Sequence, residues 1–382
     1  MTSLIWDLLF PTSRKFPNTK SARTEDIPAD AWRLGQLWLG RPGSGKTWAL
    51  ARAAVDHLIK HPNEAMVSFD ANQSFTDAFL TIVLSKPKEI RDALIKRIIY
   101  DEIGHPVYTI TMPDLHEAYK VPMEKQVKRS IQNFKALNPE LVTETPVMGG
   151  ISIKQYGTEL FRLLSVIPNE HGSTWQLTEA KHLLVNDFLL NRMLHDYGAL
   201  APTAKWFFEK KFKNLKDDEK DKRTLGLTSV LDDIEAPEIR PRIGYHRPSF
   251  AMPQFIEEAK IWLINGHNIN DQESTLAFEF VRLKSIIMNE IAKRTPNNPN
   301  DYPFTMIFDE VPAILNFMGD EISSFGTYFR SRQLQPVVVA QMLSQFPEDL
   351  REQIFGYASV ICFSLLPFQS RFQVAQELFP YI

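Results

Sequence analysis

One short stretch, residues 40–47, constrains this chain more than any other. Its order, Gly-Arg-Pro-Gly-Ser-Gly-Lys-Thr, matches the phosphate-binding pattern G-x-x-x-x-G-K-T. An apolar run at 36–39 precedes it, and apolar residues at helical spacing follow it, which predicts a strand–loop–helix unit. Glycine permits the positive φ angles that let successive backbone N–H groups surround a phosphate. The predicted nucleotide-binding residues are Gly40, Arg41, Pro42, Gly43, Ser44, Gly45, Lys46 and Thr47.

Two side chains at the end of this stretch indicate which ligands it binds. Lys46 can reach the β and γ phosphates of ATP, and the Thr47 hydroxyl can coordinate Mg²⁺. The N-terminus of the following helix adds a dipole that favours anions. A glycine-rich turn without a ligand is the alternative, and the flanking strand and helix argue against it. ATP and Mg²⁺ are therefore the expected cofactors.

Composition and charge narrow the class of protein. The chain has 382 residues, of which 44% are apolar and 23% charged, as in soluble globular proteins. Its net charge of −3 provides no global basic field, so any contact with nucleic acid has to be local. The single cysteine, Cys362, excludes an intramolecular disulfide, and no apolar run is long enough to span a bilayer. We expect a cytoplasmic protein without a transmembrane segment in this chain, associated with a membrane at most through partners.

From residue 31 the chain alternates strand and helix patterns, after a proline-containing lead-in at 1–30. The second strand ends on Asp70, which either faces the nucleotide or only forms a turn. The elements expected after the phosphate loop are a helix that ends near residue 61, a strand at 66–69, helices at 73–84 and 87–103, and a strand at 106–111. This βαβαβ order predicts a parallel sheet covered by helices.

Residues 113–235 differ in character from what precedes them. Strand patterns become rare, and amphipathic helical patterns with leucine on one face dominate. We interpret this range as a mostly helical insertion into the sheet domain. The lysines at 205–216 are followed by interleaved acids, which favours an exposed, solvated surface over contact with nucleic acid.

Apolar strand patterns return after residue 235. They cover 260–265, 304–308, 336–340 and 358–363, with a long amphipathic helix between the first two. Near-continuous apolar strands suit a sheet that is buried on both faces. The prediction is an α/β domain at 31–112 and 236–382 with a mostly parallel central sheet, interrupted by the helical insertion at 113–235.

An acidic pair, Asp309-Glu310, marks a second candidate site. It follows the apolar strand at 304–308, and open α/β sheets bind ligands at the carboxyl ends of their strands. Asp309 can complete the Mg²⁺ shell that Thr47 also touches, and Glu310 can polarise the attacking water. An acidic pair that only starts a turn is the alternative. The complete phosphate loop upstream makes the catalytic interpretation the stronger one.

Gln341 and Arg330 are the remaining catalytic candidates. Gln341 ends the strand at 336–340, where an amide can sense the γ-phosphate or place the water, or can simply hold the next loop. Arg330 and Arg332 lie on the helix or turn that leads into this strand. We expect Arg330 near the ligand edge of the sheet, where an arginine presented to a neighbouring subunit's nucleotide would stabilise transition-state charge. A surface arginine paired with an acid such as Glu321 is an equally good interpretation.

Taken together, these motifs resemble one group of ATPases. The phosphate loop, the strand that ends in Asp309-Glu310 and the segment 330–341 are similar to those of the HerA–FtsK ring ATPases. Within that group, the order of parts looks most like the type IV secretion coupling proteins and related conjugation ATPases. Residues 344–346 and the last strand fit as well. The resemblance covers the core strands over most of 33–378, and the insertion matches only in position and character.

The resemblance implies a RecA-like P-loop NTPase fold of the ASCE type, and a homohexameric ring that hydrolyses ATP to move DNA through its central pore. It implies catalytic roles for Glu310, Gln341 and Arg330, with Arg330 as a finger acting across a subunit boundary, and metal binding by Thr47 and Asp309. Secretion or relaxase-type proteins would be partners. Two features differ from the family: its transmembrane helices are missing here, and Asp70-Ala71-Asn72 stands where the family often has Asp-Pro-Lys.

Three classes of function stay open at this point. A DNA-translocating motor predicts ATP hydrolysis that DNA strongly stimulates. A secretion or virion-assembly ATPase that moves protein predicts stimulation by a protein partner and indifference to DNA, and a phage- or defence-related ATPase is a variant without DNA translocation. A nucleotide-dependent switch predicts binding with little turnover, and the intact Asp309-Glu310 pair argues against it.

Overall fold

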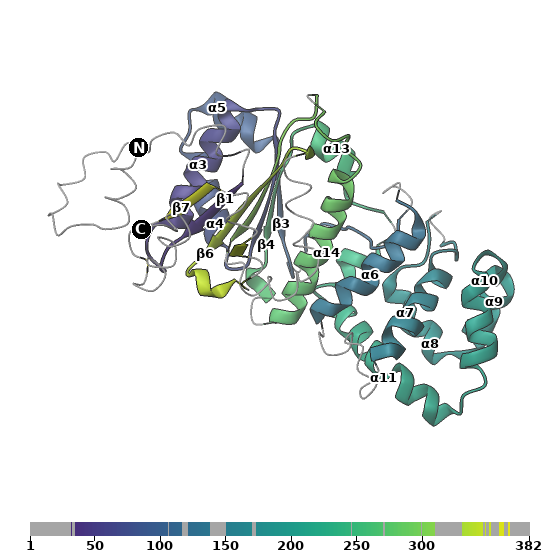
Figure 1. Ribbon diagram of the computed structural model, residues 1–382. Helices are drawn as coiled ribbons and strands as arrows, with labels where there is room; N and C mark the ends of the chain where they lie inside the picture. The colour runs from purple at the N-terminus through teal and green to yellow at the C-terminus, as the bar shows by residue number, and fades with distance from the viewer. Residues whose placement is uncertain are drawn as a thin grey trace. The chain divides into compact units, whose positions relative to one another are not determined.

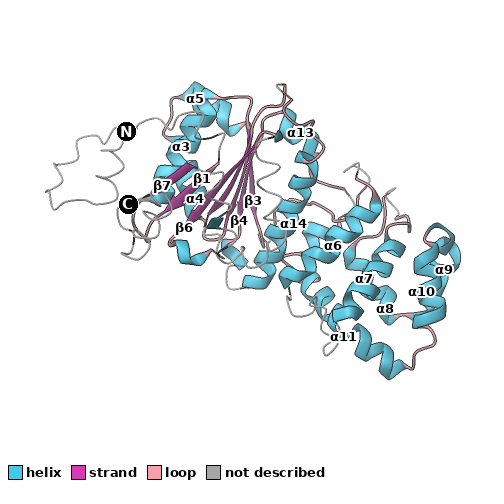
Figure 2. Cartoon of the chain, viewed as in Figure 1, coloured by secondary structure: helices cyan, strands magenta, loops and turns pink. Residues whose placement is uncertain are grey.

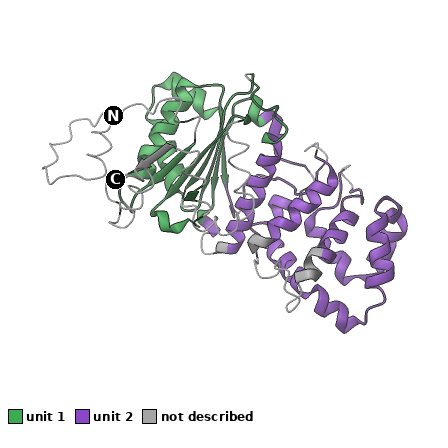
Figure 3. Cartoon of the chain, viewed as in Figure 1, with its two compact units in different colours: residues 1–101, 255–267, 291–382 green, residues 102–254, 268–290 purple. Residues whose placement is uncertain are grey.

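The computed structural model divides the chain into two compact units (Figure 3). Unit 1 comprises Met1–Asp101, Phe255–His267 and Ile291–Ile382, and unit 2 comprises Glu102–Gln254 and Asn268–Glu290. The structure describes residues 32, 35–105, 107–116, 121–137, 150–169, 173–245, 247–269, 272–298, 300–309, 331–346, 348, 351–352, 359–362 and 366.

Unit 1 contains a seven-stranded sheet in the order β3-β4-β2-β5-β6-β1-β7 (Figures 1 and 2). The pairings among β1, β2, β4, β5, β6 and β7 are all parallel. The predicted α/β class with a mostly parallel central sheet is therefore confirmed. The strands are β1 Gln36–Leu39, β2 Ala65–Asp70, β3 Ile98–Glu102, β4 Ile261–Asn265, β5 Phe304–Asp309, β6 Leu334–Ala340 and β7 Ser359–Cys362.

The register of the strands brings polar residues together at one edge of the sheet. Asp70 at the end of β2 lies opposite Asn265 of β4 on one side and opposite Asp309 of β5 on the other. On the far side of β5, strand β6 pairs with β1, so that Ala340 lies opposite Leu39. Because parallel strands all end on the same side, this carboxyl edge carries the turns that follow them, and the opposite, amino edge carries the turns that lead into them.

Helices α3 (Lys46–Lys60), α4 (Ser74–Leu84) and α5 (Lys88–Ile95) cover one face of this sheet (Figure 1). Alternate strand residues, among them Trp38, Met66 and Val339, join the helices in one apolar cluster, because successive side chains of a strand point to opposite faces. The helices contribute Leu50, Val55 and Leu58 of α3 and Phe75, Phe79 and Val83 of α4. Full burial of each large side chain contributes about 1.5–3 kcal/mol, so this packing fixes β1, α3 and the loop between them.

The third strand lies elsewhere than the sequence pattern suggests. The helix expected at 87–103 ends at Ile95, and β3 follows it in place of a strand at 106–111. The backbone N–H groups of Val107 and Tyr108 are bonded to the Nδ1 atom of His105, at 3.2 and 2.9 Å, and not to a neighbouring strand. A side chain therefore supplies the hydrogen bonds that a strand partner would have supplied.

Unit 2 is mostly helical around a core of aromatic side chains. The ring of Phe134 lies 5.3 Å from that of Phe161 and 6.2 Å from that of Phe278. Phe278 belongs to α14, so unit 2 takes up residues 268–290 as well as the range 113–235 in which helical patterns dominate.

The described helices after β3 are α6 Met123–Leu137, α7 Gly150–Leu164, α8 Leu177–Val185, α9 Asp187–Tyr197, α10 Pro202–Phe207, α11 Asp217–Ile234, α12 Arg240–Gly244, α13 Met252–Glu257 and α14 Glu273–Ile291, with short helical turns η4 Gly198–Leu200, η5 Phe208–Phe212, η6 His267–Ile269 and η8 Leu343–Gln345. Across the part of the chain that the structure describes, no helix combines the length and the apolarity that crossing a membrane requires.

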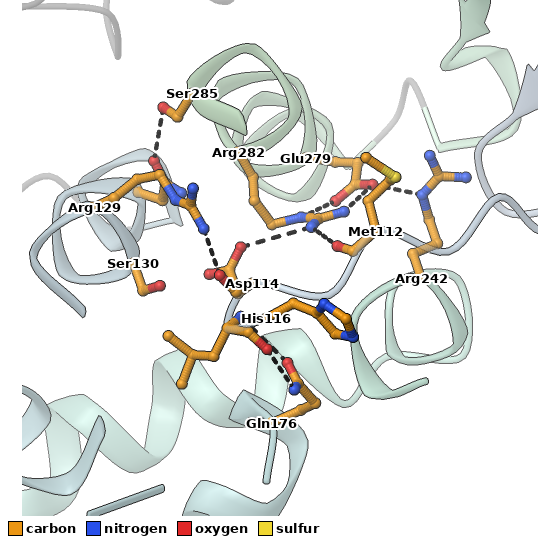
Figure 4. A network of polar contacts seen from close by, with 12 residues as sticks. Met112, Asp114, His116, Arg129, Ser130, Gln176, Arg242, Glu279, Arg282 and Ser285 are labelled. Atoms are coloured by element: carbon orange, nitrogen blue, oxygen red, sulfur yellow. Dashed lines mark hydrogen bonds and ion pairs between the residues drawn. The ribbon is translucent and has the colours of Figure 1, made fainter. Parts of the chain in front are cut away.

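A network of buried charges connects α14 to the rest of unit 2 (Figure 4). The Arg282 guanidinium donates hydrogen bonds to the Glu279 carboxylate at 2.7 and 2.8 Å and to the carbonyl oxygen of Met112. Arg242 donates to Glu279 at 2.5 Å, and Asp114 forms an ion pair with Arg282 at 3.6 Å. These four charged side chains are at most 1% exposed. Each is tolerated inside the unit because an opposite charge lies beside it.

The charges in this network decide the protonation of Glu279. Burial by itself would raise the pKa of its carboxyl group, but the positive charges of Arg282 and Arg242 and their hydrogen bonds outweigh burial and lower the pKa to about 2. Burial opposes the charge of Arg282 in the same way, and the carboxylate of Glu279 outweighs it and raises the pKa of Arg282. Glu279 is therefore ionised at neutral pH.

Candidate nucleotide-binding site

The phosphate loop has a backbone that glycine makes possible. Gly43 and Gly45 have φ angles of +75° and +80°, in the left-handed region, and Gly45 is the residue at which α3 begins. The backbone N–H of Ser44 donates to the carbonyl oxygen of Arg41 at 3.1 Å and closes the turn. A Cβ atom added at Gly43 or Gly45 would meet nothing within 4 Å. The two glycines are thus required for their dihedral angles, and the space beside them is open to a ligand.

Lys46 directs a buried charge into this loop. Its side chain is 5% exposed, and among the residues that the structure describes it has no hydrogen bond or ion pair. An anion beside a buried ammonium group stabilises it. Thr47 follows on the first turn of α3 and is partly exposed. That residues 40–47 bind phosphate stays a prediction, and the open loop and the buried Lys46 are in line with it.

Gln341 stands directly beside the loop. The backbone N–H of Gly40 donates to the carbonyl oxygen of Ala340 at 3.2 Å, which fixes the start of the loop against the end of β6. The turn after β6 is held by Gln345, whose Oε1 atom accepts from the backbone N–H groups of Gln341 and Met342 at 2.8 and 3.0 Å. The Gln341 side chain itself forms no hydrogen bond with the described residues. Among the described residues, Gln345 and not the Gln341 amide holds this turn.

Asp309 lies at the same edge as the loop, and a serine orients it. The Asp309 side chain is fully buried, and its Oδ2 atom accepts a hydrogen bond from the Ser74 hydroxyl at 3.1 Å. Strand β5 is two positions from β1 in the sheet, which separates their backbones by roughly 10 Å. Ser74 is a site residue that no motif reveals, because it is 235 residues away from Asp309 in the chain.

Asp70 has a structural task in the turn after β2. One carboxylate oxygen accepts from the backbone N–H of Asn72 at 3.2 Å, and the other accepts from that of Thr76 at 2.8 Å. The side chain is 1% exposed. It therefore holds the connection into α4 and places Ser74 against Asp309, which favours the turn-forming interpretation of Asp70.

Two of the predicted catalytic residues, Glu310 and Arg330, lie outside the described residues. The residues that follow Arg330 enter β6 at its first residue, so they lie at the amino edge of the sheet, opposite the phosphate loop. Arg332 is fixed there: its guanidinium donates to the carbonyl oxygen of Ala292 at 3.3 Å, and its own carbonyl accepts from Arg294 at 3.1 Å. Arg332 therefore lies on the turn that leads into β6, as expected, and this turn is at the amino edge because a residue that leads into a parallel strand lies at the strand's start. The expected position of Arg330 near the ligand edge falls outside the described residues.

The site would hold a metal ion only together with a nucleotide. Within the described parts of the chain, no three His, Cys, Asp or Glu side chains are arranged to bind a metal by themselves. Mg²⁺ is commonly bound by one or two carboxylates, water and the phosphates of a substrate. Asp309, buried and fixed by Ser74, and the Thr47 hydroxyl fit this mode of binding.

Unit 2 has a separate surface feature, a groove of about 680 Å³ lined mostly by α8 and α11, with Asp187 of α9 and Phe212 of η5. Two lysines, Lys181 and Lys220, and four aspartates lie in its wall, which gives the lining a net charge of −2 (two positive, four negative). Lys220 is hydrogen-bonded to Asp187 at 3.0 Å, and Lys181 to Asp232. The groove therefore disfavours a polyanion and suits a cationic or uncharged partner.

Two of the lysines at 205–216 contact nearby side chains. Lys205 forms an ion pair with Glu209 at 3.9 Å, and the ammonium of Lys211 lies 5.3 Å from the ring centroid of Trp206. Contacts of this kind are common on solvated surfaces and contribute little each. They are in line with an exposed surface in this part of unit 2.

The comparisons with known proteins concern the whole chain. A solved structure of the bacterial conjugative coupling protein TrwB, in an unbound form, matches with a TM-score of 0.59 and 15% identity over 87% of this chain and 68% of that one. TrwB in complex with ADP and Mg²⁺ matches with a TM-score of 0.58 and 16% identity over 87% and 71%. VirB4 of Thermoanaerobacter pseudethanolicus matches with a TM-score of 0.52 and 10% identity over 90% and 80%. No protein-family model matches the sequence, and no curated protein is significantly similar to it.

At such low identity the likeness concerns the fold. One of the two neighbours is a conjugative coupling protein, and the coupling proteins are the proteins that the order of motifs in the sequence resembles. The match extends over most of the chain, both units included. This chain therefore has the P-loop ATPase fold of the conjugative coupling protein TrwB and of VirB4.

Proposed function

We propose that the chain is an ATP-hydrolysing motor of the HerA–FtsK type that works in conjugation or type IV secretion, and that it moves DNA through a homo-oligomeric, hexameric ring. The observation that carries this proposal is the joint position of the phosphate loop and Asp309 at the carboxyl edge of one parallel sheet. The shared fold with TrwB, which has been crystallised with ADP and Mg²⁺ and with a non-hydrolysable ATP analogue, supports it.

The residues divide into those that bind and those that react. Residues 40–47 hold the phosphates of ATP through backbone N–H groups, and Lys46 places its charge between the β and γ phosphates. Thr47 and Asp309 ligate Mg²⁺, which neutralises phosphate charge when it is bound. Ser74 keeps the Asp309 carboxylate in position. The position of β1 and β5 in one parallel sheet supports this part of the proposal.

The chemical step is assigned to three further residues. Glu310, directly after Asp309, orients a water molecule and takes its proton as the oxygen attacks the γ-phosphorus. The bond from the γ-phosphorus to the oxygen that bridges it to the β-phosphate breaks in the same reaction, so that ADP leaves with this oxygen and inorganic phosphate is released. Gln341, beside the loop, fixes the same water or senses the γ-phosphate. Arg330 of a neighbouring copy stabilises the charge that develops on the γ-phosphate, since the residues after it lie at the amino edge, away from the phosphate loop of the same chain.

The deciding experiment is the ATPase rate of the full chain without DNA, with single-stranded DNA and with double-stranded DNA. A DNA motor should be stimulated strongly by at least one form, because translocation couples turnover to the bound strand. Stimulation should weaken steeply with salt, since phosphate contacts release counterions. Turnover that is indifferent to both forms of DNA would reject DNA translocation while leaving the ATPase assignment intact.

A second candidate, an ATPase that moves protein, is favoured by the acidic groove of unit 2. Its net charge of −2 would repel the DNA backbone but can accept a cationic polypeptide. A secretion ATPase should be stimulated by its protein partner and should not respond to DNA. Replacing Asp221 and Asp232 by asparagine should then weaken the response to that partner and leave basal turnover unchanged.

A further inference from the structure

Trp48 is an exposed aromatic side chain beside the phosphate loop. It directly follows Thr47 on the first turn of α3 and is 51% exposed, whereas Trp32 and Trp38 of the same unit are only 2% and 3% exposed. The apolar cluster under α3 does not include it. An exposed tryptophan offers a large flat ring on which another ring can stack.

The geometry of a helix aims this ring at the loop. In an α-helix each Cα–Cβ bond tilts toward the N-terminus, so a side chain on the first turn covers the N-terminal end. The N-terminal end of α3 is the phosphate loop, with its open space beside Gly43 and Gly45. Trp48 therefore borders the volume that a ligand of Lys46 would enter.

The base and the γ-phosphate are at opposite ends of a nucleotide. Lys46, which is only 5% exposed, anchors the β and γ phosphates. The reacting end of the nucleotide then faces Asp309 and Gln341. A base on the other side of the loop from this reacting end would contact residues of the first turn of α3. Trp48 is the aromatic residue there.

We propose that Trp48 is the surface on which the base of a purine nucleoside di- or triphosphate stacks. This inference rests on the proposed function and adds to it the residue that holds the base. Stacking on an aromatic side chain tolerates any base, because every base has a π-face. The site therefore binds adenine and guanine nucleotides with similar affinity as far as Trp48 is concerned.

The experiment compares a ligand with a base to one without. Binding of ADP and of inorganic tripolyphosphate, each with Mg²⁺, is measured by titration calorimetry on the full chain. Trp48→Ala should weaken ADP binding about tenfold, within the range known for base–aromatic stacking, and leave tripolyphosphate binding unchanged. Trp48→Phe should restore most of the ADP affinity. Trp206→Ala is the matched control: this residue is 55% exposed but lies in unit 2, and both ligands should bind as before.

The outcomes separate the inference from the proposed function. Lys46→Ala should lose both ligands, and a wild-type chain that binds neither would overturn the nucleotide site and Trp48 with it. If tripolyphosphate binding depends on Lys46 but ADP binding is the same with and without Trp48, only the stacking proposal fails. An equal loss of both ligands in Trp48→Ala would show damage to the loop. A change of oligomeric mass by light scattering, with ADP affinity unchanged, would make Trp48 a subunit contact.

Discussion

Asp309 and Glu310 are adjacent residues for which we expect different roles. Glu310→Gln keeps the size and polarity of the side chain but removes the base, so ATP should still bind while turnover falls by about two orders of magnitude or more. Asp309→Asn should instead raise the Mg²⁺ concentration that hydrolysis needs. Steady-state rates and equilibrium ATP binding, each over a range of Mg²⁺, distinguish the two. An unchanged rate in Glu310→Gln beside an inactive Asp309→Asn would place the base elsewhere.

Ser74 is predicted to act through Asp309. Its hydroxyl is bonded to the carboxylate at 3.1 Å, and loss of such a partner to a metal ligand commonly lowers metal affinity about 10-fold to 100-fold. Ser74→Ala should therefore shift the Mg²⁺ dependence of the ATPase to higher concentration, with the rate restored at saturating Mg²⁺. Ser74→Thr, which keeps the hydroxyl, should remain close to wild type.

Ser85→Ala is the control for that variant. Ser85 follows the other end of α4, where its hydroxyl bonds the carbonyl oxygen of Ile82 at 2.7 Å. Its loss should alter neither the rate nor the Mg²⁺ dependence. If both serine variants behave alike, the hydrogen bond to Asp309 has no part in metal binding.

At the scale of elements, Glu279 makes the attachment of α14 sensitive to acid. Its folded-state pKa of about 2 lies below the ordinary value of 4.5, so the stability that this group adds is complete above about pH 4.5 and is lost as the pH falls toward 2. Glu279→Gln removes this dependence. It should also lower the free energy of unfolding at neutral pH by about 3–5 kcal/mol, because Arg282 and Arg242 are left buried without their carboxylate.

Urea unfolding at several pH values between 2.5 and 7, followed by circular dichroism, measures this effect. Glu257→Gln serves as the control, since Glu257 is exposed and should keep the wild-type dependence on pH. An acid dependence in Glu279→Gln that equals that of wild type would contradict the assignment. The comparison of the two variants cancels the contribution of the other carboxyl groups.

The elements of unit 1 differ in how well their sequence determines them. Strands β1 and β5 were predictable because short apolar runs end at a glycine-rich loop or an acidic pair, and α4 because its apolar period has clear limits. Strand β3 was not, because residues 98–100 also continue the helical pattern that starts at 87. Whether 107–111 joins the sheet depends on His105 and on Ser249, which is distant in the chain. The Ser249 hydroxyl accepts a hydrogen bond from the backbone N–H of Thr111 at 2.8 Å.

At the scale of the whole molecule, a ring with shared sites predicts a specific result on mixing two variants. Lys46→Ala has a defective phosphate site and an intact arginine, and Arg330→Ala has the reverse. Each alone should have almost no ATPase activity, with nucleotide affinity retained in Arg330→Ala because its charge acts in the transition state. In mixed rings some intact sites would receive an arginine from a Lys46→Ala neighbour, so part of the activity should return.

Co-assembly is checked by mass before the rates are compared. Absence of recovery in rings that contain both variants would reject action across a subunit boundary. Full activity of Arg330→Ala alone would make Arg332 the next candidate for this role. The Arg332 guanidinium, however, donates a hydrogen bond to the Ala292 carbonyl oxygen, which gives Arg332 a structural role. A monomeric wild-type chain with high turnover would reject the ring itself.

The interleaving of the two units also sets an order of events during synthesis on the ribosome. Strand β1 lies between β6 and β7, which are synthesised much later. Met112 and Asp114 both contact Arg282, which follows Met112 by 170 residues in the chain. At a translation rate of about 5–20 residues per second, that interval lasts on the order of ten to thirty seconds. During this time the nascent chain carries a phosphate loop without its neighbouring strands and an acidic residue without its arginine. Both units therefore reach completion only after most of the chain has left the ribosome, and neither can mature as an early, independent domain.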